Sequence, residues 1–355
     1  MMTRALSLLS LLLLLAASFA QETGDFSTEE LLQQGDFYYA NGDCLTSQYL
    51  FQGALERDPD NAAAMLGKGQ ALVCQGALER GIEEYQNVID AYPDELSAYV
   101  QLADAYRLQY QSDPERYADR LGDALDLLER AEEIGDNAAL SNMRGVLLYE
   151  QDDTEGAREA LENAVALEGD NAGYQADLGA VYRNAGALEE ALAAFKRAVV
   201  LQPNNASFRN DLGAAYFALE RCGDAEFELR QAVELDENLL AANFNLARTL
   251  FDCEQVDESI PFFQKVIDID GVSLPPAYTY LARAYIQQSQ LDKAVTEATK
   301  GAVLPPANAE AYYWLGQAYE IRGGAGDLDK ARDAYERALE IDPDFASARE
   351  ALDQL

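Results

Sequence analysis

Small and large apolar residues alternate with polar ones in a pattern that returns about every 34 residues along most of the chain. Each unit holds a small anchor residue with a large residue three positions later, then a second small residue with a bulky one four positions later. Spacings of three and four place side chains on one face of a helix, so each unit predicts two helices packed against each other. The anchors are Gly35, Gly69, Ala103, Gly145, Gly179, Gly213, Ala247, Ala282 and Gly316.

Each unit is therefore predicted to contain a helix A, a short turn and a helix B. Proline stops a helix, and several units carry one where helix B should end. A fixed period of this length indicates stacked repeats rather than one globular core, and a stack of repeats offers a long surface suited to binding. The prolines are Pro59, Pro93, Pro203, Pro306 and Pro343.

The spacing of these residues resembles the tetratricopeptide repeat family, whose period is 34 residues. The fifth unit carries the resemblance best, and the ninth matches almost as well. The resemblance implies an all-α fold, a right-handed α-solenoid of helix-turn-helix repeats. The matching residues of the fifth unit are Leu178, Gly179, Tyr182, Ala191, Phe195, Ala198 and Pro203.

We predict nine repeats followed by a capping helix at 345–355, with a short segment at 21–27 before the first repeat. The third repeat has extra residues near Leu108–Asp123, and the ninth has three more around Gly323, Gly324 and Gly326. Each insertion is either tolerated loop variation or, in the third repeat, a contact loop at the turn between the two helices. The predicted repeats are 28–61, 62–95, 96–137, 138–171, 172–205, 206–239, 240–274, 275–308 and 309–344.

The first 20 residues are typical of a secretory signal peptide. Arg4 gives a positive start, a leucine-rich core follows, and Ser18 and Ala20 are small residues at the positions that determine cleavage. An uncleaved anchor is the alternative, although Ala5–Ala20 is short for a membrane span. We expect cleavage before Gln21, no later membrane insertion, and a periplasmic or secreted protein.

The four cysteines occur twice in the same relation to the repeats. Cys44 and Cys222 both fall in the turn between helices A and B, and Cys74 and Cys253 fall near the end of helix A in the following repeat. The phase predicts two disulfides, Cys44–Cys74 and Cys222–Cys253, which suit an exported protein. Four unrelated buried thiols are the alternative.

The composition narrows the function further. The formal net charge is −37, which repels nucleic-acid phosphates and anionic lipid surfaces. The chain contains no histidine, the usual general base and a common metal ligand, and the repeats leave no room for a catalytic domain. We therefore expect a non-enzymatic protein with no cofactor, no metal site and no nucleic-acid partner.

The family resemblance implies that positions 2, 5, 9 and 12 of each helix A line a concave groove. In repeats four to eight these positions hold three arginines and no acidic residue, although the chain is very acidic. Arginine and aromatic side chains are frequent in binding hot spots, so this stretch is the candidate groove. Its predicted partner-binding residues are Asn142, Tyr149, Arg183, Asn210, Phe217, Phe244, Arg248, Phe251 and Arg283 at these positions, together with Asn245 at position 6.

These features together predict an exported scaffold that binds an extended peptide or a partner helix of another protein. Envelope assembly or secretion is the setting that family analogy suggests. Two alternatives remain open: a structural solenoid that self-associates through its terminal repeats, and an accessory subunit that presents a cell-wall or carbohydrate-active enzyme.

Overall fold

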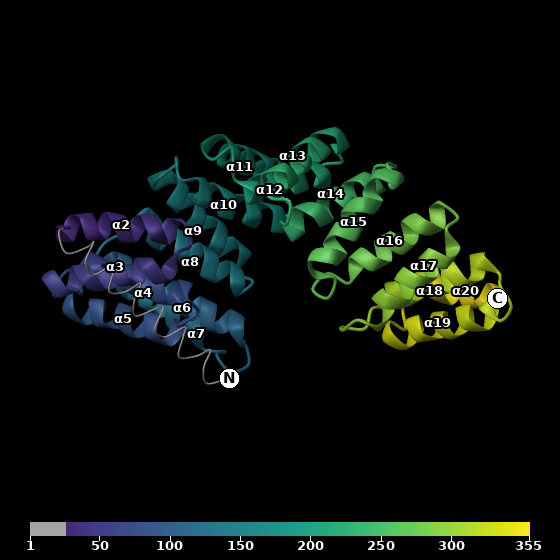
Figure 1. The fold of residues 1–355 in the computed structure, drawn as a ribbon, viewed down its shortest axis with the longest axis horizontal. Helices are drawn as coiled ribbons and strands as arrows, with labels where there is room; N and C mark the ends of the chain where they lie inside the picture. The colour runs from purple at the N-terminus through teal and green to yellow at the C-terminus, as the bar shows by residue number, and fades with distance from the viewer. Residues whose placement is uncertain (1–25) are drawn as a thin grey trace, which may run out of the picture. The chain divides into compact units, whose positions relative to one another are not determined.

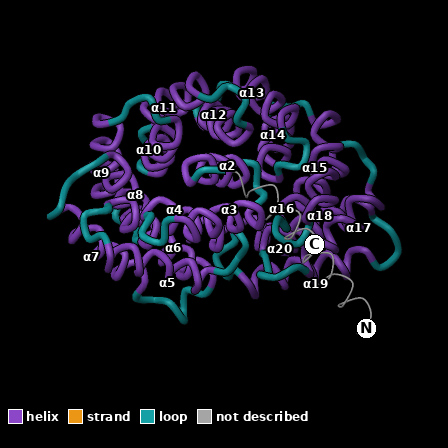
Figure 2. The backbone as a smooth tube through the Cα atoms, turned by 60° about the vertical axis from the view of Figure 1, so that its left-hand side comes forward, coloured by secondary structure: helices purple, strands orange, loops and turns teal. Residues whose placement is uncertain are grey.

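The computed structural model describes residues 26–355, which form nineteen helices joined by loops and contain no strand (Figure 2). The chain divides into two compact units, the first ending at Gly169 and the second beginning at Asp170. The predicted signal peptide at 1–20 lies outside the described residues. Between residues 26 and 355, no helix combines the length and apolar character that crossing a membrane requires.

The first unit contains four helix pairs, as its four predicted repeats require (Figure 1). The first helix of each pair packs against its own second helix and against the first helix of the next pair. The all-α repeat prediction is confirmed here. The helices are α2 (Thr28–Ala40), α3 (Cys44–Arg57), α4 (Ala62–Cys74), α5 (Leu78–Ala91), α6 (Leu96–Ser112), α7 (Arg120–Glu132), α8 (Ala138–Glu150) and α9 (Thr154–Leu167).

The second unit contains five helix pairs and the predicted terminal helix (Figure 1). Its pairs stack in the same way as those of the first unit, and the terminal helix packs on the last pair. The helices are α10 (Ala172–Asn184), α11 (Leu188–Leu201), α12 (Ala206–Ala218), α13 (Cys222–Leu235), α14 (Leu240–Asp252), α15 (Val256–Asp270), α16 (Pro276–Gln287), α17 (Leu291–Val303), α18 (Ala309–Arg322), α19 (Asp327–Ile341) and α20 (Ala346–Gln354).

Close contacts between glycines of the first helices and aromatic rings of the second helices hold the stack together. A Cβ atom added to Gly35 would lie 2.8 Å from the ring of Phe51, and one added to Gly67 would lie 2.4 Å from the same ring. Phe51 on α3 thus fills the space left by glycines on α2 and on α4, and it is 1% exposed. Gly316 and Tyr335 repeat this contact in the second unit, where the added Cβ would lie 2.4 Å from the ring. The predicted fit of large residues beside small ones is confirmed.

The turn between the two helices of a repeat requires one residue with a left-handed backbone. Gly42, Gly76 and Gly186 take this conformation at equivalent places, with φ between 76° and 78°. Glu220 takes it in the sixth repeat with φ of 59°, although a side chain makes this conformation less favourable. The turn geometry is therefore a property of the repeat, and glycine is not indispensable to it.

The insertion in the third repeat lengthens α6 and adds a turn at 113–119 before α7. Gln109 in the last turn of α6 is 2% exposed, and its amide donates a hydrogen bond of 2.7 Å to Glu79 at the start of α5. The hydroxyl of Tyr117 in the added turn donates to the same carboxylate at 3.4 Å. The insertion therefore packs onto the preceding repeat of the first unit.

The insertion in the ninth repeat forms a turn around the buried carboxylate of Asp327, which pairs with the half-buried Arg322. The Asp327 carboxylate accepts hydrogen bonds from Nε and Nη2 of Arg322, both at 2.8 Å, and from the backbone N–H of Gly324 at 2.9 Å. Asp327 is 1% exposed. The hydrogen bonds from Arg322 hold the pKa of Asp327 well below its usual range.

This turn predicts a specific dependence of stability on pH. Because the pKa of Asp327 is lower in the folded chain than in the unfolded chain, its charge stabilises the fold above the unfolded value of about 3.9 and ceases to do so as pH falls through the folded value. We expect Asp327→Asn to lower the melting temperature at pH 7, and the difference from the wild type to shrink as pH falls below about 4. Thermal unfolding measured across this pH range tests the expectation.

The matched control is Asp329→Asn, which removes the same charge from a side chain that is 86% exposed, two residues away. Asp329→Asn should leave the melting temperature nearly unchanged both at pH 7 and below a pH of about 4. An equal loss in both variants would show that the stabilisation comes from the general charge of α19 rather than from the turn.

Candidate binding face on the second unit

The first helices of the five repeats in the second unit form one continuous face, because each contacts the next along the series. We call this surface, made by α10, α12, α14, α16 and α18, the A-helix face (Figure 1). Asn142 and Tyr149, both half-buried on α8, belong to the first unit and are not part of it. The other eight predicted groove residues lie on its helices: Arg183, Asn210, Phe217, Phe244, Asn245, Arg248, Phe251 and Arg283.

An aromatic cluster connects α14, α15 and α16 beneath this face. The ring of Phe263 stacks on Tyr280 with centroids 5.3 Å apart, and Phe251 meets Tyr280 edge-on at 5.5 Å. Phe244 meets both Phe263 and Tyr280 edge-on, at 6.2 and 6.1 Å. Since Phe263 is 0% exposed and Phe251 is 6% exposed, these rings form the core of the seventh and eighth repeats. Phe251 is therefore a packing residue, whereas Phe244 and Tyr280 are half-buried and keep part of their surface in solvent.

Arg283 on α16 lies over three aromatic rings at once. Its guanidinium carbon is 4.8 Å from the centre of the Phe251 ring and 4.9 Å from the centres of both Tyr280 and Trp314. Contacts of this kind contribute about 0.5–2 kcal/mol and hold the guanidinium in one place. The nearest ion pair, with Glu310 on α18, is 3.9 Å long. This length exceeds hydrogen-bond distance, so Glu310 neutralises Arg283 only loosely.

Arg248 on α14 is arranged in a similar way. Its guanidinium carbon lies 4.8 Å from the centre of the Phe217 ring on α12, and its Nε is 3.5 Å from a carboxylate oxygen of Asp252 one turn along α14. The Arg248 side chain is 44% exposed. The arginine is thus supported from one side by an aromatic ring and keeps a large part of its surface in solvent.

A polar network crosses the face between α14, α12 and α10. Asn245 donates a hydrogen bond of 2.8 Å from Nδ2 to Oδ1 of Asn210. Nδ2 of Asn210 in turn donates to a carboxylate oxygen of Asp211 at 3.3 Å. Burial raises the pKa of Asp211, and the nearby charge of Arg183 partly opposes this rise. Asn210 is 8% exposed, so it positions the network rather than offering a free amide to a partner.

The sequence pattern underestimated the negative charge beside this face. Asp252 lies 3.5 Å from Arg248 and Glu310 lies 3.9 Å from Arg283, and the charge of Arg183 acts on Asp211. Asp252 is at position 13 of its helix and Asp211 is at position 6, so neither falls at positions 2, 5, 9 or 12, from which the groove was predicted. Glu310 belongs to the ninth repeat, whereas the predicted groove covers repeats four to eight. The face therefore carries paired charges, with the arginines held in place by aromatic rings.

Two residues that support Arg283 were absent from the predicted site. Tyr280 and Trp314 both occupy position 6 of helix A, in the eighth and ninth repeats. The aromatic residues at this position are the signal that could have identified them. Trp314 also donates a hydrogen bond of 3.2 Å from Nε1 to Glu310 and is the only tryptophan in the chain.

The chemistry of this face favours recognition of carboxylates beside apolar groups. A guanidinium stacked on aromatic rings still presents its N–H edge, which forms paired hydrogen bonds with a carboxylate. In the described part of the chain, no three His, Cys, Asp or Glu side chains are grouped so as to hold a metal ion.

A separate cavity of about 500 Å³ lies in the first unit between α7, α8 and α9, where Arg144 pairs with Glu132 at 2.6 Å.

Family models match four segments of the chain. A model described as TPR repeat matches residues 179–220. Two models described as tetratricopeptide repeat match residues 32–95 and 280–346, and residues 240–272. These segments together cover more than half of the sequence and fall in both units.

Individual proteins and solved structures are also similar to this chain. A segment of 105 residues, 30% of this chain, is 30% identical to the heat shock protein STI1 of Saccharomyces cerevisiae. It spans only 17% of that protein. The crystal structure of a thermophilic TPR protein from Thermus thermophilus is 27% identical, with a TM-score of 0.50, over 54% of this chain and 100% of that one.

A more distant structure extends the likeness in fold along the chain. The APC/C hetero-tetramer Cut9–Hcn1 matches 96% of this chain and 91% of the aligned one, with a TM-score of 0.54 and 14% identity. The helix pairs, their spacing and the matched family models agree, and the chain belongs to the tetratricopeptide repeat family.

Proposed function

We propose that this protein is an exported, non-enzymatic scaffold that binds an acidic and apolar segment of a partner protein on the A-helix face of its second unit. Family membership supports a protein–protein interaction scaffold. The observation that carries the finer proposal is Arg283, which three aromatic rings hold in place while its own acidic neighbour, Glu310, is 3.9 Å away. A partner carboxylate can approach the guanidinium more closely than Glu310 does, without the arginine having to move.

The apolar part of the partner has a matching surface. Phe217 and Phe244 are both half-buried residues of the A-helix face, and Phe217 lies beneath the Arg248 guanidinium. Aromatic rings supply much of the buried apolar area in protein interfaces. A segment that alternates acidic and apolar side chains would therefore meet arginines and rings in turn along the face.

Two features support export. The residues from Arg4 to Ala20 are typical of a secretory signal peptide. Both cysteine pairs, Cys44–Cys74 and Cys222–Cys253, are joined as disulfides, which persist in oxidising compartments. Envelope assembly or secretion is the process that we propose for the scaffold.

Reversing the charge of both arginines, Arg248→Glu with Arg283→Glu, is expected to weaken binding of an acidic and apolar peptide about tenfold, because two partly exposed ion pairs contribute roughly 1.4 kcal/mol together. The probe is a labelled peptide of alternating Glu and Leu residues, and the measurement is fluorescence anisotropy. The fluorescence of Trp314, 4.9 Å from the Arg283 guanidinium, should change on binding to the wild type.

The matched control reverses Arg197 and Arg337, which are 47% and 53% exposed on the second helices α11 and α19. It makes the same change in net charge away from the A-helix face and should leave the affinity unchanged. Equal weakening by both double variants would mean that the peptide responds only to overall charge, and the proposal would fail. Circular dichroism checks that each variant remains helical. Arg283→Gln removes the positive charge without adding a negative one, so its affinity shows how much of the weakening comes from losing the arginine charge.

A further inference from the structure

The first helix of the first repeat presents an exposed stripe of side chains spaced as one helical face. Glu30, Gln33, Phe37 and Asn41 on or directly after α2 are all exposed, and Phe37 is 59% exposed. We call these four residues the α2 stripe.

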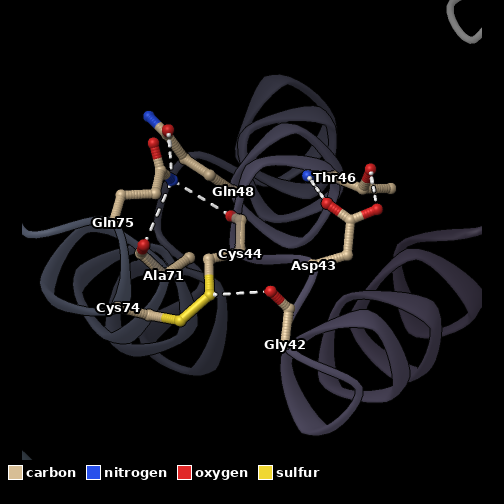
Figure 3. Close-up of a disulfide and its surroundings, with 8 residues drawn as sticks. All are labelled: Gly42, Asp43, Cys44, Thr46, Gln48, Ala71, Cys74 and Gln75. Atoms are coloured by element: carbon tan, nitrogen blue, oxygen red, sulfur yellow. Dashed lines mark hydrogen bonds between the residues drawn. A yellow bond between two sulfur atoms is a disulfide. The ribbon is translucent and has the colours of Figure 1, made fainter. Parts of the chain in front are cut away.

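The same positions in the second repeat lie inside the structure. Ala64 and Ala71 on α4 are 0% exposed, and Gly67 between them is also buried. Figure 3 shows Ala71 and Gln75 at the end of α4 beside Cys44 and Gln48 of α3, the second helix of the preceding repeat, with the Gln75 amide joining the two helices. The equivalents of the α2 stripe therefore form the surface that a repeat offers to the second helix of the repeat before it.

The position of Phe37 makes this comparison general. With the anchor residue counted as position 8, Phe37 stands at position 10, and in repeats two to four and six to nine the residue at position 10 is at most 2% exposed. Only in the first repeat is it open to solvent. The buried residues at this position are Ala71, Ala105, Leu147, Ala215, Thr249, Ala284 and Ala318.

We propose that the α2 stripe is a docking surface for a helix of a partner protein, which lies where the second helix of a preceding repeat would lie. The polar end of the stripe matches this arrangement. In the second repeat, Gln75 donates hydrogen bonds to the Cys44 carbonyl at 3.0 Å and to the side-chain oxygen of Gln48 at 2.9 Å (Figure 3). Asn41 stands at the equivalent position in the first repeat and can donate in the same way to a docked helix.

The size of Phe37 and the charge around it define the partner helix. Because Phe37 is much larger than Ala71, the partner must present a small residue opposite it. The helix α2 carries Glu29, Glu30 and Asp36 and contains no lysine or arginine, so the partner must carry basic residues beside its apolar stripe. A second copy of this chain would bring the same acidic surface and is disfavoured by like-charge repulsion.

The proposal is tested with two synthetic helices of about 18 residues, long enough to be helical when isolated. Both carry an alanine and leucine stripe, with lysine on the flanks of one and glutamate on the flanks of the other. We expect the full chain to bind the lysine helix at physiological salt, and Phe37→Asp to weaken this binding at least about tenfold, as loss of a central aromatic anchor does. Fluorescence anisotropy gives the affinities, and hydrogen exchange should show protection of α2.

The matched control is Phe227→Asp, which places the same new charge on a phenylalanine that is 61% exposed on α13. Both substitutions add negative charge, so a lysine helix held only by general attraction would bind either variant at least as well as the wild type. The proposal requires Phe37→Asp alone to lose binding. Three results would overturn the proposal. The two variants could bind the lysine helix with equal affinity, or the wild type could bind the glutamate helix as well as the lysine helix. Binding could also be lost through Arg248→Glu with Arg283→Glu rather than through Phe37→Asp.

Sedimentation of the wild type and of Phe37→Asp tests the alternative occupant. We expect the same mass for both. A wild-type dimer that Phe37→Asp converts to a monomer would assign the α2 stripe to a second copy and would also overturn the proposal. Either result leaves the proposed function of the A-helix face standing, because Phe37→Asp changes none of the eight residues assigned to that face.

Discussion

Replacing Phe263 by alanine is expected to destabilise the second unit by about 3–5 kcal/mol, the cost of removing a fully buried phenylalanine. Phe263 is 0% exposed and stacks on Tyr280 at a centroid distance of 5.3 Å, so the substitution leaves a cavity that other rings also line. Chemical unfolding followed by circular dichroism measures the loss. The effect is large because one ring joins α14, α15 and α16.

The loss should also be local. Stability in a repeat protein is roughly a sum over repeats and their interfaces with nearest neighbours. We therefore expect faster hydrogen exchange in α14–α16, with the helices of the first unit unchanged. Phe227→Ala, on the exposed surface of α13, should change stability by no more than about 0.5 kcal/mol. Uniform loss of protection along the chain would show that the protein unfolds as one cooperative body.

This experiment also separates packing from binding at the candidate site. From the sequence, Phe244 and Phe251 were expected to be partner anchors, whereas both contact Phe263 and Tyr280. Alanine at either position would weaken a partner complex and the fold together. Only substitutions that keep the aromatic cluster intact, such as those at Arg248, test the A-helix face without this ambiguity.

The fold could be predicted from the sequence because the same packing residues recur at the same spacing in every repeat. Gly179 and Phe195 recur with the spacing of Gly35 and Phe51, and in both pairs an added glycine Cβ would lie 2.8 Å from the ring. A single pair would have been ambiguous, but nine units in phase define where each helix pair belongs. The same register also predicted which cysteines would meet.

The candidate site was predictable only in part. Helix positions identified Arg248 and Arg283 as face residues, because which side of a helix a residue occupies follows from its spacing. Spacing within one helix does not reveal contacts made by the next helix, so the contacts of Glu310 and Trp314 with Arg283 were not predicted, although Glu310 itself stands at a groove position of the ninth repeat. The exposure of Phe37 was not predicted either, because the repeat pattern does not show which helix face is left uncovered within the described residues 26–355.

Removing the disulfide of the second unit, Cys222→Ser with Cys253→Ser, is expected to lower the free energy of unfolding by about 3–4 kcal/mol in the chain-entropy model. The two cysteines are 31 residues apart in sequence and join the start of α13 to the residue after α14. Since the helix-packing residues remain, the variant should still be helical. Denaturant unfolding by circular dichroism measures the change, and peptide mapping without reduction checks the pairing in the wild type.

The next repeat interface supplies a noncovalent control at the same edge. There Gln288, directly after α16, donates a hydrogen bond of 2.6 Å to Asp257 in the first turn of α15. Gln288→Ala should cost only about 0.5–1.5 kcal/mol in total, because it removes this exposed hydrogen bond and the one that Gln290 donates to the Gln288 side-chain oxygen. If the double cysteine variant lost no more stability than Gln288→Ala, the covalent link would add little to the contacts that already join these repeats. The disulfides would then be evidence of an oxidising compartment and of little consequence for stability. A loss several times larger would show that restriction of the unfolded chain stabilises this interface.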